Sequence, residues 1–284
     1  MRFSNVLRYG LISAAFGALA APALGFGIGL QPTTVEIEVE PGERQRQVIN
    51  LGNVHNEKTI SLTIGLADWT LDEGGQIQLA PPGEREDSAS DWVRFSPAFV
   101  TLKPGESEQI VVDMAAPMRT EREGDYRFAM IASTILPESR NGQSGVWKKY
   151  QIASLFYLTM GDAVSDPVIK GASLSAQPDG EQVVMVDVEN DGNAHARLRG
   201  TVEISGTSGE DLSMPISNLV VLHEGKRSYA VPVSGELPSE PEVKVVLENI
   251  FSPQSSGGST ILPSFKSPLV LKRADTDSTE TSLE

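Results

Sequence analysis

Residues that could carry acid–base, nucleophilic or metal chemistry are few and widely scattered in this sequence. There is no cysteine, and the only histidines are His55, His195 and His223. His55 lies between two predicted strands, and the other two lie beside turn residues. Because a metal site needs several ligands that converge, we expect all three histidines to be structural or exposed to solvent. No Gly-x-Ser-x-Gly elbow, phosphate-binding loop or His-Glu-x-x-His motif occurs, so the sequence predicts a protein that is not an enzyme and needs no cofactor.

One group of carboxylates has a spacing that could hold calcium. Asp187, Glu189 and Asp191 alternate along a predicted strand, so their side chains project from the same face. A calcium-binding loop would also need an Asp-x-Asp-x-Asp-Gly pattern with a distal glutamate, which is missing here. We therefore interpret the group as a solvated acidic face and predict no metal site.

The overall composition excludes further classes of function. The chain has 284 residues, with 23 Lys and Arg against 38 Asp and Glu, and a formal net charge of −15. An acidic protein without a concentrated basic patch repels phosphate backbones, so no nucleic-acid partner is expected. A chain of this length can bury enough apolar surface to fold without the disulfides that stabilise small secreted domains.

The first 25 residues have the pattern of a secretory signal peptide. Arg2 and Arg8 precede the stretch 10–21, which is uncharged and rich in glycine and alanine. This stretch is shorter than the roughly 20 apolar residues that a membrane span needs, so we favour cleavage over an uncleaved anchor. No later stretch is long and apolar enough to span a bilayer. The mature protein is expected in the periplasm, with the cell surface as a second possible location.

The elements that carry these residues are predicted to be strands. In the run 33–40, Val35, Ile37 and Val39 alternate with glutamates, which is typical of a half-buried strand. Similar runs recur at roughly 10- to 20-residue intervals and are separated by Pro-Gly and Asn-Gly turns. The pattern predicts an all-β fold with sandwich domains over residues 26–165 and 166–272, followed by a disordered acidic tail over 273–284. We expect the main aromatic side chains to form the core: Trp69, Trp92, Phe95, Phe99, Phe128, Phe156 and Tyr157.

The order of motifs in the first domain resembles a known family. Pro97, the run Leu102-Lys103-Pro104-Gly105-Glu106, the strand 109–112 and later strands at 126–132 and 152–158 resemble the N-terminal domain of periplasmic pilus-assembly chaperones. The first strand, which ends at Pro41-Gly42, is also similar. The resemblance implies two immunoglobulin-like sandwiches, the first of which lends its last strand to an unfinished fibre subunit. It also implies a secreted pilus subunit, and possibly an outer-membrane usher, as partners.

The resemblance also implies specific site residues, and here the sequence departs from the family pattern. The family holds the terminal carboxylate of the subunit with an arginine in the first strand and a lysine in the last strand. Matching the strands places these positions on Thr34 and Ser154, so both cations are missing and the chain is a non-standard member. The register of the last strand stays open on sequence alone. The candidate partner-binding strand comprises Trp147, Lys148, Lys149, Tyr150, Ile152, Ser154, Phe156 and Leu158.

Two classes of function follow from these observations. The first is a chaperone-like protein that assembles pilus subunits, or other secreted β-strand subunits, by β-strand addition, with Lys148 and Lys149 as possible substitutes for the missing cations. The second is a structural or adhesive envelope protein with two self-contained sandwiches. The second is supported by the missing cations and the acidic surface. A third, glycan-binding module would need clustered exposed aromatic side chains.

Overall fold

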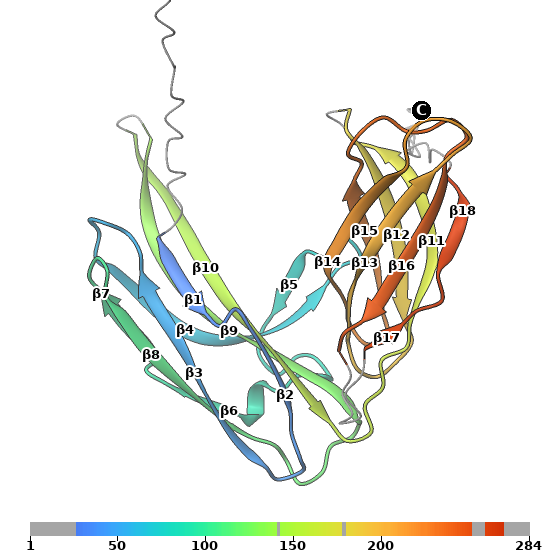
Figure 1. Ribbon diagram of the computed structural model, residues 1–284. Coiled ribbons are helices and arrows are strands. Elements are labelled where there is room, and N and C mark those ends of the chain that lie inside the picture. The colour runs from blue at the N-terminus through green and yellow to red at the C-terminus, as the bar shows by residue number, and fades with distance from the viewer. Residues whose placement is uncertain (1–26, 141–142, 178–179, 252–258, 270–284) are drawn as a thin grey trace, which may run out of the picture.

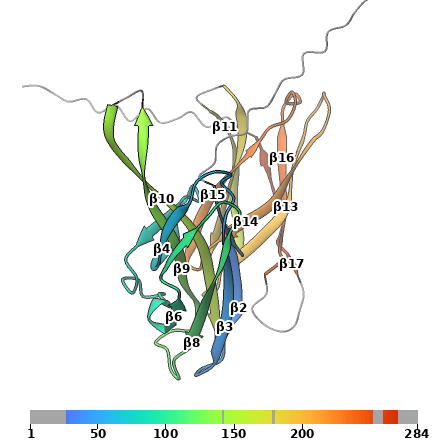
Figure 2. The ribbon, with the colours of Figure 1, turned by 90° about the vertical axis from the view of Figure 1, so that its left-hand side faces the viewer.

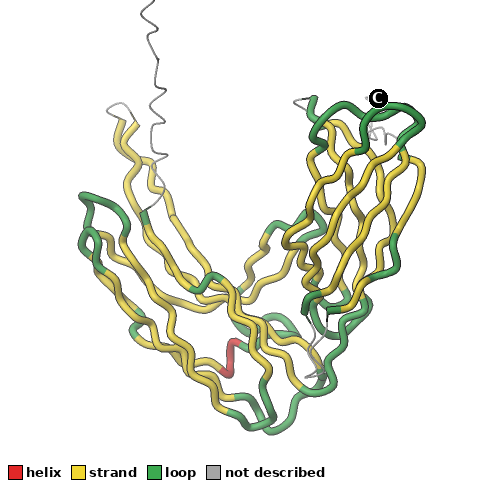
Figure 3. The backbone as a smooth tube through the Cα atoms, viewed as in Figure 1, coloured by secondary structure: helices red, strands yellow, loops and turns green. Residues whose placement is uncertain are grey.

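The computed structural model describes residues 27–140, 143–177, 180–251 and 259–269, and the side chains of all of these except 136–140 and 143–147. Two β-rich lobes meet at one end and diverge to form a V (Figures 1 and 3). The short 3-10 helix Ser90–Trp92 lies in the first lobe. Among the described residues, no helix is long and apolar enough to cross a membrane.

The first lobe is a sandwich of two sheets. One sheet has the order β1 (Ile28–Gln31), β3 (Arg44–Asn53), β8 (Ser107–Ala115), β6 (Val93–Ser96). The other has the order β2 (Thr34–Glu38), β10 (Gln143–Met160), β9 (Gly124–Arg140), β4 (Ile60–Leu71), β5 (Ile77–Ala80), and β7 (Phe99–Leu102) also pairs with β4. The chain thus moves from one sheet to the other between β1 and β2.

Alternating apolar residues form the core between these two sheets. Ile60, Leu62 and Ile64 of β4 are buried, as the alternation predicted, and they face inward toward Phe128 and Phe156. The rings of these two phenylalanines are stacked with centroids 4.3 Å apart. Burial of such aromatic side chains is the main stabilising contribution in a sandwich of this size.

The second lobe is a separate sandwich with its own core. One sheet has the order β11 (Pro167–Ala176), β12 (Gln182–Asn190), β15 (Gly225–Pro232). The other has the order β14 (Leu212–Val221), β13 (Ala196–Ser205), β16 (Glu242–Asn249), β17 (Thr260–Ile261), with β18 (Phe265–Pro268) also paired to β16. Buried valine and leucine side chains dominate this core.

The all-β fold with two sandwiches is confirmed, but the prediction that Phe99 belongs to the core was wrong. Phe99 is 62% exposed, because its side chain lies on the outer face of β7. The sequence also indicated a strand at 269–272, most of which lies outside the described residues. The predicted signal peptide and acidic tail also lie outside the described residues.

Candidate functional site

Strand β10 is unusual because only part of one of its edges is covered. Strand β9 pairs with it from Val146 to Met160, and the two form a long hairpin arm that reaches beyond the rest of the first sandwich (Figures 1 and 2). On its other side β2 runs parallel to β10 and covers only Leu155 to Thr159. Strand β1 lies beside β10 but pairs with β3 instead. In the described part of the chain, no strand pairs with this side of β10 at Lys149, Gln151 or Ala153, and we call this side of residues 149–153 the open edge.

Hydrogen bonds at the covered end show which backbone groups point to the open edge. The N–H of Leu155 donates to the carbonyl of Thr33 at 2.9 Å, and the carbonyl of Thr159 accepts from the N–H of Val39 at 2.9 Å. Backbone groups alternate between the two sides of a strand, and β10 pairs with β9 without a register shift above Val146. The N–H and C=O groups that point toward the open edge are therefore those of Lys149, Gln151 and Ala153.

The inward face of β10 corrects part of the predicted binding strand. Phe156 and Leu158 are fully buried in the core of the first sandwich and belong to the stretch that β2 covers. Ser154 is also fully buried, and its hydroxyl donates to the carbonyl of Pro32 at 2.7 Å. None of these three side chains is accessible to a partner in this fold. Ile152 is half-buried against the same core. Tyr150, two residues closer to the tip of the arm on the same face, is also half-buried.

The opposite face of β10 points toward the second sandwich. It carries the exposed Lys149 and Gln151 and the half-buried Ala153 and Leu155. Lys149 lies opposite Ile135 of β9, which is 60% exposed. Lys148 is exposed on the other face of the arm, and the side chain of Trp147 lies outside the described ones.

The two positions matched to the family's cations lie close together, but they do not form a matched pair. Thr34 is exposed at the start of β2 and lies directly opposite Leu155, whereas the side chain of Ser154 points to the other face. The cation that approaches this region is Arg197 of β13, which forms an ion pair with Glu36 of β2. The arginine side chain is 18% exposed, so the second sandwich supplies a partly accessible positive charge here.

An apolar cluster joins the two sandwiches. Trp69 and Tyr157 of the first sandwich pack against Val220 and Leu222 of the second. The two aromatic rings meet edge to face with centroids 5.0 Å apart. The indole N–H of Trp69 donates to the carbonyl of Phe128 at 3.1 Å, so its polar atom is satisfied inside the protein.

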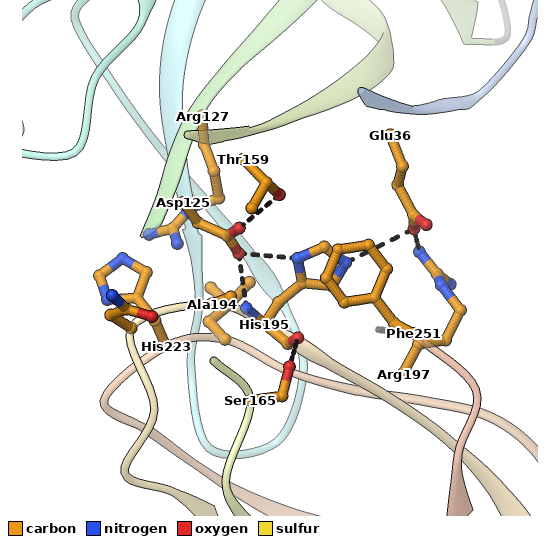
Figure 4. A network of polar contacts seen from close by, with 12 residues as sticks. Glu36, Asp125, Arg127, Thr159, Ser165, Ala194, His195, Arg197, His223 and Phe251 are labelled. Carbon is orange, nitrogen blue, oxygen red and sulfur yellow. Dashed lines mark hydrogen bonds and ion pairs between the residues drawn. The ribbon is translucent and has the colours of Figure 1, made fainter. Parts of the chain in front are cut away.

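Polar side chains surround this apolar cluster. His195 is fully buried and contacts Asp125 and Glu36 of the first sandwich (Figure 4). His223, close by in Figure 4, accepts or donates a hydrogen bond with Asp87 at 2.9 Å. Burial alone would raise the pKa of Asp87, but the His223 hydrogen bond and the Arg127 charge hold it far below its usual range.

Sequence reasoning missed the role of these two histidines. It expected structural or exposed turn residues, and the structure places both at the joint between the sandwiches. His195 and its partner Asp125 are 70 residues apart in the chain, and no local motif signals such a contact. The only sequence signal was a polar turn, Asn190 to Asn193, next to a strand that begins at Ala196.

Comparisons with known proteins give similar folds at low sequence identity. No protein-family model and no curated sequence matches the chain. Among solved structures, the class 5 fimbriae chaperone CfaA is 11% identical with a TM-score of 0.42, and the match covers 83% of this chain and 99% of that chain. The CsuC–CsuE chaperone–tip adhesion subunit complex from archaic chaperone-usher Csu pili of Acinetobacter baumannii is 14% identical with a TM-score of 0.40. That match covers 87% of this chain and 99% of the other.

Proposed function

We propose that this protein is a periplasmic chaperone that holds a secreted pilus subunit, or a similar β-strand subunit, by β-strand addition at the open edge of β10. The half-covered edge of β10 is the observation that supports this proposal. A strand edge with unpaired N–H and C=O groups is a template for a strand from another chain. In this proposal main-chain hydrogen bonds supply affinity, and an outer-membrane usher receives the subunit.

The side chains beside the open edge suit this mode of binding. Lys149 and Gln151 face the space between the sandwiches and are exposed, so they can contact a bound strand from one side. Tyr150 and Ile152 flank the strand on the opposite face. Because alternate side chains point to opposite faces, a bound strand would contact Lys149 and Gln151 on one face and Tyr150 and Ile152 on the other.

The absence of the family's cation pair favours a second candidate, a structural envelope protein whose sandwiches serve as spacers. Thr34 and Ser154 stand at the positions where the resemblance implies two cations, and neither side chain carries a charge. Under this alternative the open edge would not hold a client subunit. Purification of the tagged protein from the periplasm of its native host, with mass spectrometry of co-eluting proteins, separates the two candidates.

Replacement of Gln151 by proline tests the proposed edge directly. Proline removes the N–H that points to the open edge and leaves the N–H groups of Tyr150 and Ile152, which face β9. We expect Q151P to lower the amount of co-purified subunit about tenfold or more, since a backbone hydrogen bond is lost and the ring obstructs the added strand. The amount is measured as subunit per chaperone by mass spectrometry.

Q151T is the matched control, because threonine keeps the N–H and favours a strand. It should recover as much subunit as the original protein. I152P should instead lower the midpoint of chemical denaturation, because it removes a hydrogen bond to β9. Undiminished recovery of the subunit with a folded Q151P variant would exclude binding at this edge.

A further inference from the structure

His195 of the second sandwich forms one polar contact group at the joint, separate from the contact between His223 and Asp87. The ring Nδ1 of His195 lies 2.7 Å from Oδ2 of Asp125 (Figure 4). Its Nε2 lies 3.7 Å from Oε1 of Glu36, which is an ion-pair distance but too long for a hydrogen bond. The backbone N–H of His195 donates to the same Asp125 oxygen at 2.6 Å. The two carboxylates come from β9 and β2 of the first sandwich. A single imidazole therefore bridges two strands of one domain from the other domain.

The surroundings of the ring exclude water and restrict its orientation. The side chain of His195 is fully buried. Its ring stacks on Phe251 with centroids 3.8 Å apart and packs on Tyr157 at 4.4 Å. Burial raises the pKa of the Tyr157 hydroxyl above its usual value, so that group stays neutral. The imidazole itself is therefore shielded from solvent, whereas its partner Glu36 is partly exposed.

Each of the two carboxylates that face the ring can meet an N–H only when the ring carries a proton on both nitrogens. Asp125 and Glu36 contribute two negative charges, and Arg197, which pairs with Glu36, contributes one positive charge. Arg127, also close to Asp125, is paired with Asp87, which Arg85 and His223 contact as well. An imidazolium makes the group of four neutral and places an N–H toward each carboxylate. A neutral imidazole turns a bare nitrogen toward one of the two carboxylates.

We propose that His195 is a proton-dependent latch that fixes the second sandwich against the first. In the latched state the protonated ring bridges Asp125 and Glu36. Loss of the proton removes one of the two bridges and weakens the polar part of the joint. The apolar cluster around Trp69 and Val220 keeps the domains in contact, so the angle between them becomes variable. The latch is independent of whether β10 binds a subunit.

The pKa shifts of these groups agree with this geometry. Burial alone would lower the pKa of His195, but the Asp125 hydrogen bond and the charges of Asp125 and Glu36 outweigh it and raise the pKa above its ordinary 6.5. Burial would raise the pKa of both carboxyl groups, and the His195 contacts instead hold both below their ordinary values of 3.8 and 4.5. The histidine contribution is complete below pH 6.5 and is lost as pH rises through the raised pKa. The carboxylate contribution is complete above pH 4.5 and is lost as pH falls, so the joint is tightest between these two values.

The distance between the two domains can be measured in the full mature chain. The protein has no cysteine, so E108C in β8 and K266C in β18, both at exposed positions, provide unique sites for spin labels. Double electron–electron resonance then gives the distribution of distances at about pH 5.5 and about pH 9, on either side of the histidine transition. H195Q keeps a hydrogen-bond donor but cannot carry the charge. H55Q, in a turn of the first sandwich, is the matched control.

We expect a narrow distance distribution at the lower pH and a broad one at the higher pH in the labelled protein and in H55Q. H195Q should be broad at both. If the labelled protein shows the same distribution at both pH values, or if H195Q keeps the pH response, the latch is excluded. Should H195Q fail to fold, imidazole nuclear magnetic resonance of the unsubstituted protein supplies the test. The His195 resonance should titrate above pH 6.5, and its midpoint should fall in D125N; a midpoint at or below 6.5 would overturn the proposal.

Discussion

Replacement of Phe156 by alanine is expected to lower the free energy of unfolding of the first sandwich by about 3–5 kcal/mol. Phe156 is fully buried and stacks on Phe128, so the substitution removes the transfer free energy of a large ring and leaves a cavity. Chemical denaturation followed by tryptophan fluorescence measures the effect, because Trp69 and Trp92 both lie in the same domain.

F99A provides the control for Phe156. Phe99 is 62% exposed on β7, so its loss should change the free energy of unfolding by only about 0.5 kcal/mol. An equal loss in the free energy of unfolding for F156A and F99A would show that Phe156 does not lie in the core. An aspartate at position 156 would bury a charge in an apolar core and prevent folding. Such a variant would therefore lose its partner by unfolding, and it cannot serve as a test of the open edge.

Replacement of Asp87 by alanine is expected to cost about 3–5 kcal/mol, because it leaves the Arg127 guanidinium buried without its counter-charge. The side chain of Arg127 is 2% exposed and that of Asp87 is 5% exposed. Asp87 also contacts His223 of the second sandwich, so D87A should loosen the joint as well. The denaturation midpoint and the susceptibility of the joint to limited proteolysis measure the two effects.

The ion pair between Arg46 and Asp113 offers the matched control for Asp87. Its side chains are 67% and 49% exposed, so solvent screens the pair and D113A should change stability far less than D87A. The double variant D87A/R127M should recover part of the loss, since no buried charge remains. A D87A protein as stable as D113A would contradict the assignment of Arg127 as a buried, paired cation.

Several features of the fold follow from short stretches of sequence. The alternation of Val35, Ile37 and Val39 with glutamates predicted a half-buried strand, and β2 has this pattern of burial. The same holds for β4, where Ile60, Leu62 and Ile64 face the core. Local periodicity carries this information because side chains alternate between the two faces of a strand whatever it pairs with.

Local periodicity could not predict which part of β10 would be covered. Residues 152–160 of β10 are mostly apolar on both faces of the strand. The sequence therefore did not decide which of the two alternating sets of side chains faces the core. A slip of one residue exchanges the two faces. The pairing of Leu155 with Thr34, which lie 121 residues apart in the chain, fixed the register of β10. It buried Phe156 and left Gln151 at the open edge.

The sequence by itself determined the class of fold, the acidic surface and the lack of catalytic motifs, because composition and alternation are local properties of the chain. Only the tertiary structure decided the extent of the open edge and the burial of His195 between Asp125 and Glu36. These features depend on contacts between strands and domains that are distant in the chain. Burial and electrostatic interactions in the folded molecule supply the free energy that selects such contacts. The type of a single residue predicts neither its burial nor its charged neighbours.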